Sequence, residues 1–156
     1  ATLASMKYED ILAAALKEKG DPALGKELFL KQTCVNCHTV LPDEPLKGPF
    51  LGDITTRYKR LEMIESIVKP SANLAQGFVG EVFQLKGGKI QEGFIVREAG
   101  TEVEIRNVNG QSMTLAIADI IKRRKMPNSI MPEELVNNLT LQEFASLLAY
   151  LESLKK

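Results

Sequence analysis

Apolar residues recur at helical spacing near the start of the chain. Between residues 5 and 19 they stand at i, i+3, i+4, i+7 and i+8, which places them on one face of a helix: Tyr8, Ile11, Leu12, Ala15 and Leu16. Gly20 is expected to end this helix as its C′ residue. Asp21 and Pro22 then predict a second helix to about Lys31, because Asp is a good N-cap and Pro suits the first helical position.

Two further segments carry the same helical period. The first predicts an amphipathic helix that Pro70 stops, and its apolar residues are Leu61, Ile64, Ile67 and Val68. The second lies near the end of the chain, where Thr140 and Glu143 predict a capping box. Its apolar stripe consists of Leu141, Phe144, Leu148 and Leu151.

From Phe78 the period changes from helical to alternating. Turn signals follow at nearly regular intervals, at residues 86–89, 99–100 and 109–110. We therefore predict an inserted four-stranded antiparallel meander over residues 78–118. The expected fold class is mainly α with a β insert, that is, α+β.

Length and composition are typical of one domain, because 156 residues can bury a core without disulfides. We expect a single domain over residues 1–156, with an extra N-terminal helix at 5–19 and a core formed by 21–77 and 119–156. The 44% hydrophobic and 26% charged residues are ordinary globular proportions. The formal net charge of +0 gives no general indication of nucleic acid or a membrane surface. No apolar run approaches the roughly 20 residues of a transmembrane helix.

The chemistry of the chain is concentrated in the pentapeptide Cys34-Val35-Asn36-Cys37-His38. This is the attachment signature of a c-type haem. Two thiols at this spacing can reach the two vinyl groups of a porphyrin, and the histidine that follows can ligate the iron. The 2 Cys and the 1 His of the chain all lie within these five residues. One covalently attached haem c is therefore the expected cofactor.

Other uses of these three residues find less support in the sequence. A structural zinc site needs four ligands, normally Cys or His, whereas the chain has three such residues, crowded together. A thioredoxin-like redox pair would stand near a βαβ pattern, and the sequence here is helical before the pair and irregular after it. An inert disulfide is the remaining alternative.

Three segments together resemble class I c-type cytochromes. They are Gly25-Lys26-Glu27-Leu28-Phe29 in the predicted second helix, the pentapeptide Cys34-Val35-Asn36-Cys37-His38, and the loop Gly48-Pro49-Phe50-Leu51-Gly52. In that family the Gly and the aromatic residue of the first helix meet an aromatic residue of the last helix. The resemblance therefore implies that Tyr150 crosses near Gly25, where the missing side chain leaves a notch.

Minimal class I cytochromes have no sheet. The order helix, sheet, helix over residues 21–155 is more similar to a haem-binding cytochrome subfamily of planctomycete-like bacteria, often fused to larger periplasmic proteins. The resemblance also implies that the carbonyl of Pro49 accepts a hydrogen bond from the second ring nitrogen of His38, which would fix the ring orientation. Arg57 and Tyr58 are candidate donors to a haem propionate, with a solvated arginine as the alternative.

The sixth iron ligand cannot be a second histidine of the chain, because His38 is the only histidine. Methionine, lysine, a weak ligand or an open site are the alternatives. Methionines at 6, 63 and 113 lie on predicted apolar stripes and are expected in the core. Met126 and Met131 instead stand before prolines, ahead of the final helix, where the family places its ligand. We favour Met131, because the context Ser-x-Met-Pro resembles the subfamily more closely, and keep Met126 as the alternative.

The expected function is electron transfer by a periplasmic cytochrome with His/Met ligation, not an enzyme in its own right. The chain could act alone or as a domain or subunit of a larger oxidoreductase, after removal of an export signal that its N-terminus lacks. The alternative is a haem-based sensor or ligand-binding domain with an open or weak sixth position. A dehydrogenase or an oxidase is the expected redox partner. Four consecutive cations, Lys122, Arg123, Arg124 and Lys125, are a candidate docking patch near the haem edge, or simply charged surface.

Overall fold

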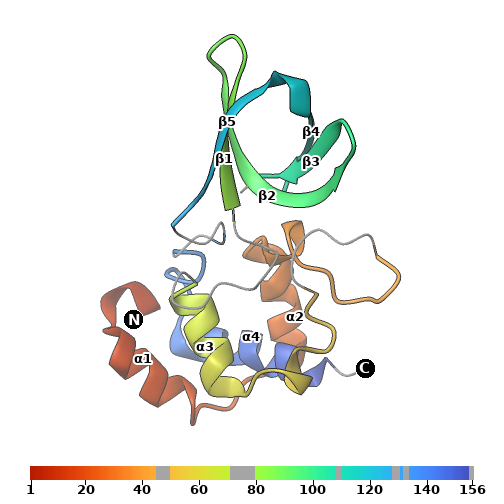
Figure 1. Cartoon of the computed structure of the whole chain (residues 1–156). Helices are drawn as coiled ribbons and strands as arrows, with labels where there is room; N and C mark the ends of the chain where they lie inside the picture. The colour runs from red at the N-terminus through yellow and green to blue at the C-terminus, as the bar shows by residue number, and fades with distance from the viewer. Residues whose placement is uncertain (45–49, 71–79, 108–109, 128–130, 132–133, 155–156) are drawn as a thin grey trace.

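The computed structural model of the chain describes residues 1–44, 50–70, 80–107, 110–127, 131 and 134–154. A group of helices lies beside a curved antiparallel sheet (Figure 1). The α-helices in the described residues are α1 (Tyr8–Ala15), α2 (Pro22–Lys31), α3 (Arg60–Val68) and α4 (Leu141–Ser153). Short 3₁₀ turns are η1 (Leu3–Ser5), η2 (Cys34–Asn36), η3 (Ile54–Thr56) and η4 (Ile117–Asp119). None of the helices in the described residues is long and apolar enough to cross a membrane.

The predicted starts of α2 and α4 are confirmed, whereas α1 begins at Tyr8 and not at residue 5. The side chain of Asp21 accepts a hydrogen bond from the N–H of Ala23 at 3.0 Å, which caps α2. In α4 the N–H of Glu143 donates to the Thr140 hydroxyl at 3.1 Å, and the Glu143 carboxylate accepts from the N–H of Thr140 at 2.9 Å. This reciprocal capping box satisfies two N–H groups that the helix itself leaves without partners.

The prediction for the end of the first helix is wrong. The helix α1 ends at Ala15, well before Gly20, and Gly20 does not have a positive φ angle. A Cβ atom at Gly20 would lie 2.1 Å from the carbonyl oxygen of Ala145. Gly20 therefore stands where it does because the chain passes directly against the backbone of α4, not because it terminates a helix.

The helices α2 and α4 cross at the predicted notch. A Cβ atom at Gly25 would lie 1.9 Å from the carbonyl oxygen of Ser146 and 2.7 Å from the Cβ of Tyr150. The rings of Phe29 and Tyr150 meet at this crossing, with centroids 5.6 Å apart and a tilt of 58°. The expected contact between the first and last helices of the core is thus present in the structure.

Hydrogen bonds that involve its backbone hold the N-terminal segment against the rest of the helical part. The N–H of Leu3 donates to the carbonyl of Leu139 at 2.9 Å. The Arg60 guanidinium donates to the carbonyl oxygens of Ala15 and Glu18 and pairs with Glu152. Arg60 therefore satisfies carbonyls at the end of α1 while it joins α3 to α4.

The sheet has five described strands, where the sequence predicted four. They are β1 (Gly80–Leu85), β2 (Ile90–Ala99), β3 (Glu102–Arg106), β4 (Ser112–Ala116) and β5 (Ile120–Lys125), in the order β4-β3-β2-β1-β5. The pairing is antiparallel throughout. The predicted turns at 86–89 and 99–100 are confirmed, and Gly87, Gly88 and Gly100 adopt φ angles of +85°, +81° and +56° that favour glycine. The sheet continues past the predicted end at residue 118, because β5 pairs with β1.

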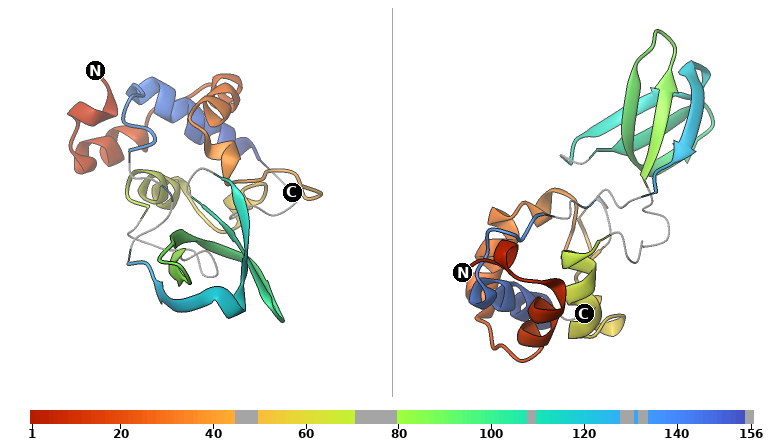
Figure 2. Two further views of the ribbon diagram at one scale, coloured as in Figure 1. Left: turned by 90° about the horizontal axis from the view of Figure 1, so that it is seen from above. Right: turned by 90° about the vertical axis from the view of Figure 1, so that its left-hand side faces the viewer.

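Two hydrophobic clusters lie in different parts of the chain. One joins the helices and includes Leu28, Phe29, Ile64, Phe144, Leu147 and Leu148. The other lies within the curved sheet and consists of the buried residues Phe83, Val103, Ile105 and Leu115. The right-hand view of Figure 2 shows the sheet standing to one side of the helices. The class α+β is therefore confirmed, with the sheet inserted between α3 and α4.

Candidate functional site

The pentapeptide predicted to carry haem follows directly on α2. Thr33 adopts a left-handed conformation, with φ of +64°, which turns the chain out of the helix. Cys34 then begins the 3₁₀ turn η2, and the N–H groups of Cys37 and His38 both donate to the carbonyl of Cys34, at 3.2 and 3.0 Å. Side chains at i and i+3 of such a turn lie on the same face. The local fold therefore directs the two thiols to one side.

The two thiols are not joined in a disulfide. Burial raises the pKa of the Cys34 thiol to about 11. Redox cysteines of the thioredoxin type instead have lowered pKa values, because the thiolate is the reactive form. The half-buried Cys34 does not have a lowered pKa, so it does not resemble such a redox cysteine. A metal site made by the protein alone is not seen among the described residues either, because no group of three or more His, Cys, Asp or Glu side chains there is placed to hold a metal ion.

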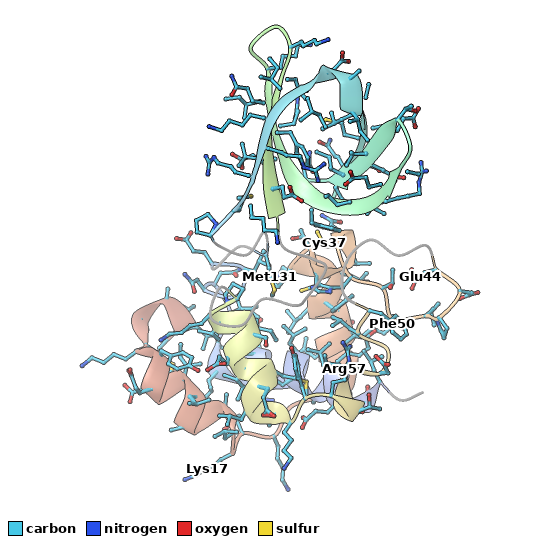
Figure 3. All side chains as sticks on the ribbon, in the orientation of Figure 1. Lys17, Cys37, Glu44, Phe50, Arg57 and Met131 are labelled. Atoms are coloured by element: carbon cyan, nitrogen blue, oxygen red, sulfur yellow. The ribbon has the colours of Figure 1, made fainter. Side chains whose placement is uncertain are left out.

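Met131 lies on the same apolar cluster as the pentapeptide. Cys34, Val35 and Met131 are each partly buried against the cluster that joins the helices, and so are Val40, Leu51 and Tyr58. In Figure 3, Cys37 and Met131 lie at the junction between the helices and the sheet. The segment with the attachment cysteines and the segment with the favoured sixth ligand therefore border one apolar region.

Met126, the alternative ligand, has a different neighbourhood. Its N–H donates to the carbonyl of Gly80 at 2.7 Å, which continues the pairing of β1 with β5 by one residue. The backbone of Met126 is thereby fixed to the sheet, whereas Met131 packs against the helices. The geometry favours Met131 as the methionine that belongs to the same apolar region as Cys34.

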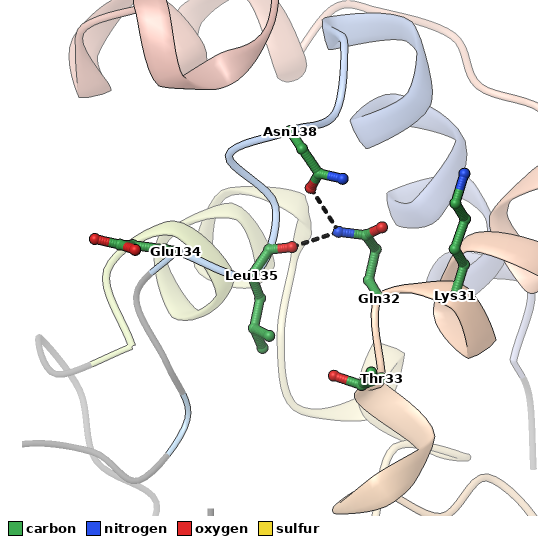
Figure 4. Close-up of a pocket in the computed structure, with 6 residues that line it drawn as sticks. All are labelled: Lys31, Gln32, Thr33, Glu134, Leu135 and Asn138. Atoms are coloured by element: carbon green, nitrogen blue, oxygen red, sulfur yellow. Dashed lines mark hydrogen bonds between the residues drawn. The ribbon is translucent and has the colours of Figure 1, made fainter. Parts of the chain in front are cut away.

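Gln32 connects the two segments, a role that sequence reasoning missed. Its amide nitrogen donates to the carbonyl of Leu135 and, at 2.8 Å, to the side-chain oxygen of Asn138 (Figure 4). Gln32 precedes Cys34 by two positions, and Leu135 follows Met131 by four. The sequence carries no signal for this role, because the burial of Gln32 and its partners are seen only in the structure.

The loop after His38 returns to the motif and is held there. The N–H of Leu51 donates to the carbonyl of the buried Thr39 at 2.8 Å. One terminal nitrogen of Arg57, Nη2, donates to the carbonyl of Phe50 at 2.7 Å and to the Asp53 carboxylate at 3.2 Å. The Nε and Nη1 groups of Arg57 make no bond to a described residue, so they can serve another acceptor. Pro49, the predicted partner of the His38 ring, lies outside the described residues.

The residues at this junction fit a covalently held haem. Two thiols on one face of a turn, a histidine next to them and a thioether on the same apolar cluster make up the donor set that haem c uses. Arg57 adds N–H donors of the kind that pair with carboxylates. The apolar lining suits the ring itself, because a porphyrin is a large flat apolar surface.

Comparison of the chain with protein-family models gave no match, and neither did comparison with curated proteins. The resemblance to class I cytochromes therefore depends on the residues and the geometry described above.

Proposed function

We propose that the chain is an electron-transfer c-type cytochrome that carries one covalent haem with His38 and Met131 as axial ligands. The observation that carries this proposal is the pentapeptide Cys34–His38 on a tight turn beside an apolar cluster that also contacts Met131. The crossing of α2 and α4 at Gly25 and Tyr150 supports it, because the first helix leads directly into the attachment turn.

A bound haem c supplies a one-electron couple between ferric and ferrous iron. In this chain Cys34 and Cys37 would hold it covalently, while His38 and Met131 would ligate the iron. Arg57 would donate to a propionate through Nε and Nη1, and the carbonyl of Pro49 would accept from the second nitrogen of His38. The apolar cluster would keep water from a haem held here, which would disfavour the more highly charged ferric state and so raise the reduction potential.

The experiment that tests this proposal is the intact mass of the purified protein under denaturing conditions. The mass is expected to exceed that of the 156-residue chain by one haem, because thioether bonds survive unfolding. Cys34→Ala and Cys37→Ala should each weaken attachment. Expression must take place where haem is attached to exported proteins, since we propose a periplasmic location. A mass equal to the bare chain after such expression would end the proposal.

The absorption spectrum of the ferric protein separates electron transfer from ligand sensing. A six-coordinate low-spin spectrum with a weak methionine-sulfur band at the red end supports an electron carrier. Immediate binding of carbon monoxide by the ferrous protein would indicate a five-coordinate iron, and hence a sensor or ligand-binding domain.

The proposed partner is a redox protein, a dehydrogenase that donates electrons or an oxidase that accepts them. The four cations predicted as a docking patch, residues 122–125, lie in β5. The sequence instead predicted them in the helical core. Arg123 is partly buried on the edge strand β5, where it pairs with Glu81 at 3.1 Å and Glu98 at 3.2 Å over the ring of Phe83. Lys122, Arg124 and Lys125 are exposed and remain available to attract an acidic partner.

Charge reversal on β5 tests this docking surface. Lys122→Glu and Arg124→Glu are expected to slow electron exchange with an acidic redox partner by about tenfold at low salt. The difference should disappear toward 0.15 M ionic strength, where the Debye length is roughly 8 Å. Lys7→Glu, an exposed cation next to α1, is the matched control and should change the rate little. Equal rates for all three variants at every salt concentration would leave β5 as ordinary charged surface.

A further inference from the structure

Gly110, which stands between β3 and β4, lies against the attachment turn. Gly110 lies so close to Asn36 that a Cβ atom at Gly110 would be 2.6 Å from the Asn36 carbonyl oxygen and 3.0 Å from the Asn36 Cβ. Asn36 stands between the two cysteines of the pentapeptide. A segment 74 positions further along the chain therefore packs on the backbone of the turn that holds both thiols.

Hydrogen bonds join the described residues around Gly110. The N–H of Gly110 donates to the carbonyl of Asn107 at 2.9 Å, and Asn107 and Gln111 exchange further bonds through their backbone and side chains. The Nη1 group of Arg106 donates to the carbonyl of Gly110 at 2.6 Å. Gly110 has a φ of +78°, which an L-residue rarely adopts. Gly110 is thus hydrogen-bonded to Arg106 and Asn107 at the position where it approaches Asn36.

We propose that Gly110, held by Arg106 and Asn107 where β3 is followed by β4, caps the attachment turn, so that the inserted sheet is part of the haem site. This inference rests on the proposed function. Because Asn36 lies between the cysteines, Gly110 seated on its carbonyl shields the edge of the ring that the thioethers hold. The cap keeps water and small reductants away from that edge, and it directs electron exchange to the part of the surface that the sheet leaves open.

Two consequences follow from the cap. Loss of the cap lets water reach the haem edge, which favours the ferric state and lowers the reduction potential. It also exposes the amides of residues 34–38 to exchange, because local opening no longer has to break the contact with Gly110. The second consequence concerns the polypeptide alone and does not depend on an attached haem.

Glycine substitutions provide a matched test in the full chain. Gly110→Ala introduces a side chain that meets the Asn36 backbone, whereas Gly88→Ala, at a similar φ of +81°, has nothing within 4 Å. Both variants carry the same backbone strain, and only Gly110→Ala should displace residue 110 from the attachment turn. Amide exchange over residues 34–38 is expected to rise about tenfold or more in Gly110→Ala, as a loss of about 1.4 kcal/mol would give. The reduction potential should also fall, because water reaches the haem edge.

Arg106→Met keeps the inference testable if Gly110→Ala fails to fold. This change removes the donor to the Gly110 carbonyl and also the Nε group, which is buried and has no partner among the described residues. Methionine keeps the apolar stem of the side chain at position 106, so the sheet should lose little stability. Faster exchange at residues 34–38, with unchanged exchange in β1 and β2, is the expected result. Exchange that matches the Gly88→Ala protein in both variants would overturn the cap, and the haem mass measured on the same samples tests the proposed function separately.

Discussion

Under the proposed function, replacing Met131 with alanine is expected to abolish a methionine-sulfur band of the ferric protein and to lower its reduction potential. A thioether is a soft ligand that favours ferrous iron, so its loss stabilises the ferric state. Axial ligands tune haem potentials over roughly 0.8 V, so the decrease should be a substantial fraction of that range. Spectroscopy and a redox titration of the purified protein measure both effects.

Met126→Ala is the matched control for this prediction. Met126 stands five positions before Met131, but its N–H is bonded to Gly80 at the start of β1. Its substitution should therefore leave the methionine-sulfur band and the potential unchanged. The opposite result, in which Met126→Ala removes the band and Met131→Ala does not, would transfer the ligand to Met126. It would also mean that the segment after β5 leaves the sheet when haem is attached.

Local signals in the sequence predicted the helices because each signal involves residues that lie close together in the chain. Asp21 with Pro22, and Thr140 with Glu143, satisfy N–H groups of their own first turn, so they act in the same way in any fold. The glycine turns at 87–88 and 100 were also predictable, since positive φ angles are easy for glycine alone.

The fifth strand could not be predicted in this way. Residues 122–125 are all cations, so they show no alternation of apolar and polar residues. Arg123 faces inward because Glu81 and Glu98 neutralise it there, and both of these partners belong to other strands. The contact of Gly110 with Asn36 was missed for the same reason, because it depends on how two distant segments meet in space.

Within the candidate site, the residues of the pentapeptide were predictable because they are contiguous in the chain. The proposed sixth iron ligand could be narrowed down only to Met126 or Met131, since loop length does not say which of the two reaches the helices. The structure adds that Met131 packs against the helical cluster and that Gln32 ties its segment to the end of α2. These are long-range contacts, which leave no periodic signal in the sequence.

Gly25→Ala is expected to destabilise the protein by about 3 kcal/mol, the sum of overpacking and lost contacts at a helix crossing. Helix propensity alone predicts the opposite sign, because alanine favours a helix by roughly 1 kcal/mol over glycine. Packing should dominate, since the new Cβ would stand 1.9 Å from the carbonyl oxygen of Ser146, a backbone atom of α4. The helices must then separate, which also loosens the contact between Phe29 and Tyr150. Urea unfolding measures the change.

Lys26→Ala is the control for Gly25→Ala, because it places the same residue one position further on, on the exposed side of α2. Its effect should stay within about 0.5 kcal/mol. For a domain of this size a loss of 3 kcal/mol lowers the Tm by about 6–12 °C. A Gly25→Ala protein as stable as the Lys26→Ala protein would mean that α2 and α4 do not cross as closely as described. Because α2 leads directly into the turn of Cys34 and Cys37, separation of these helices should also reduce the fraction of chains that acquire haem.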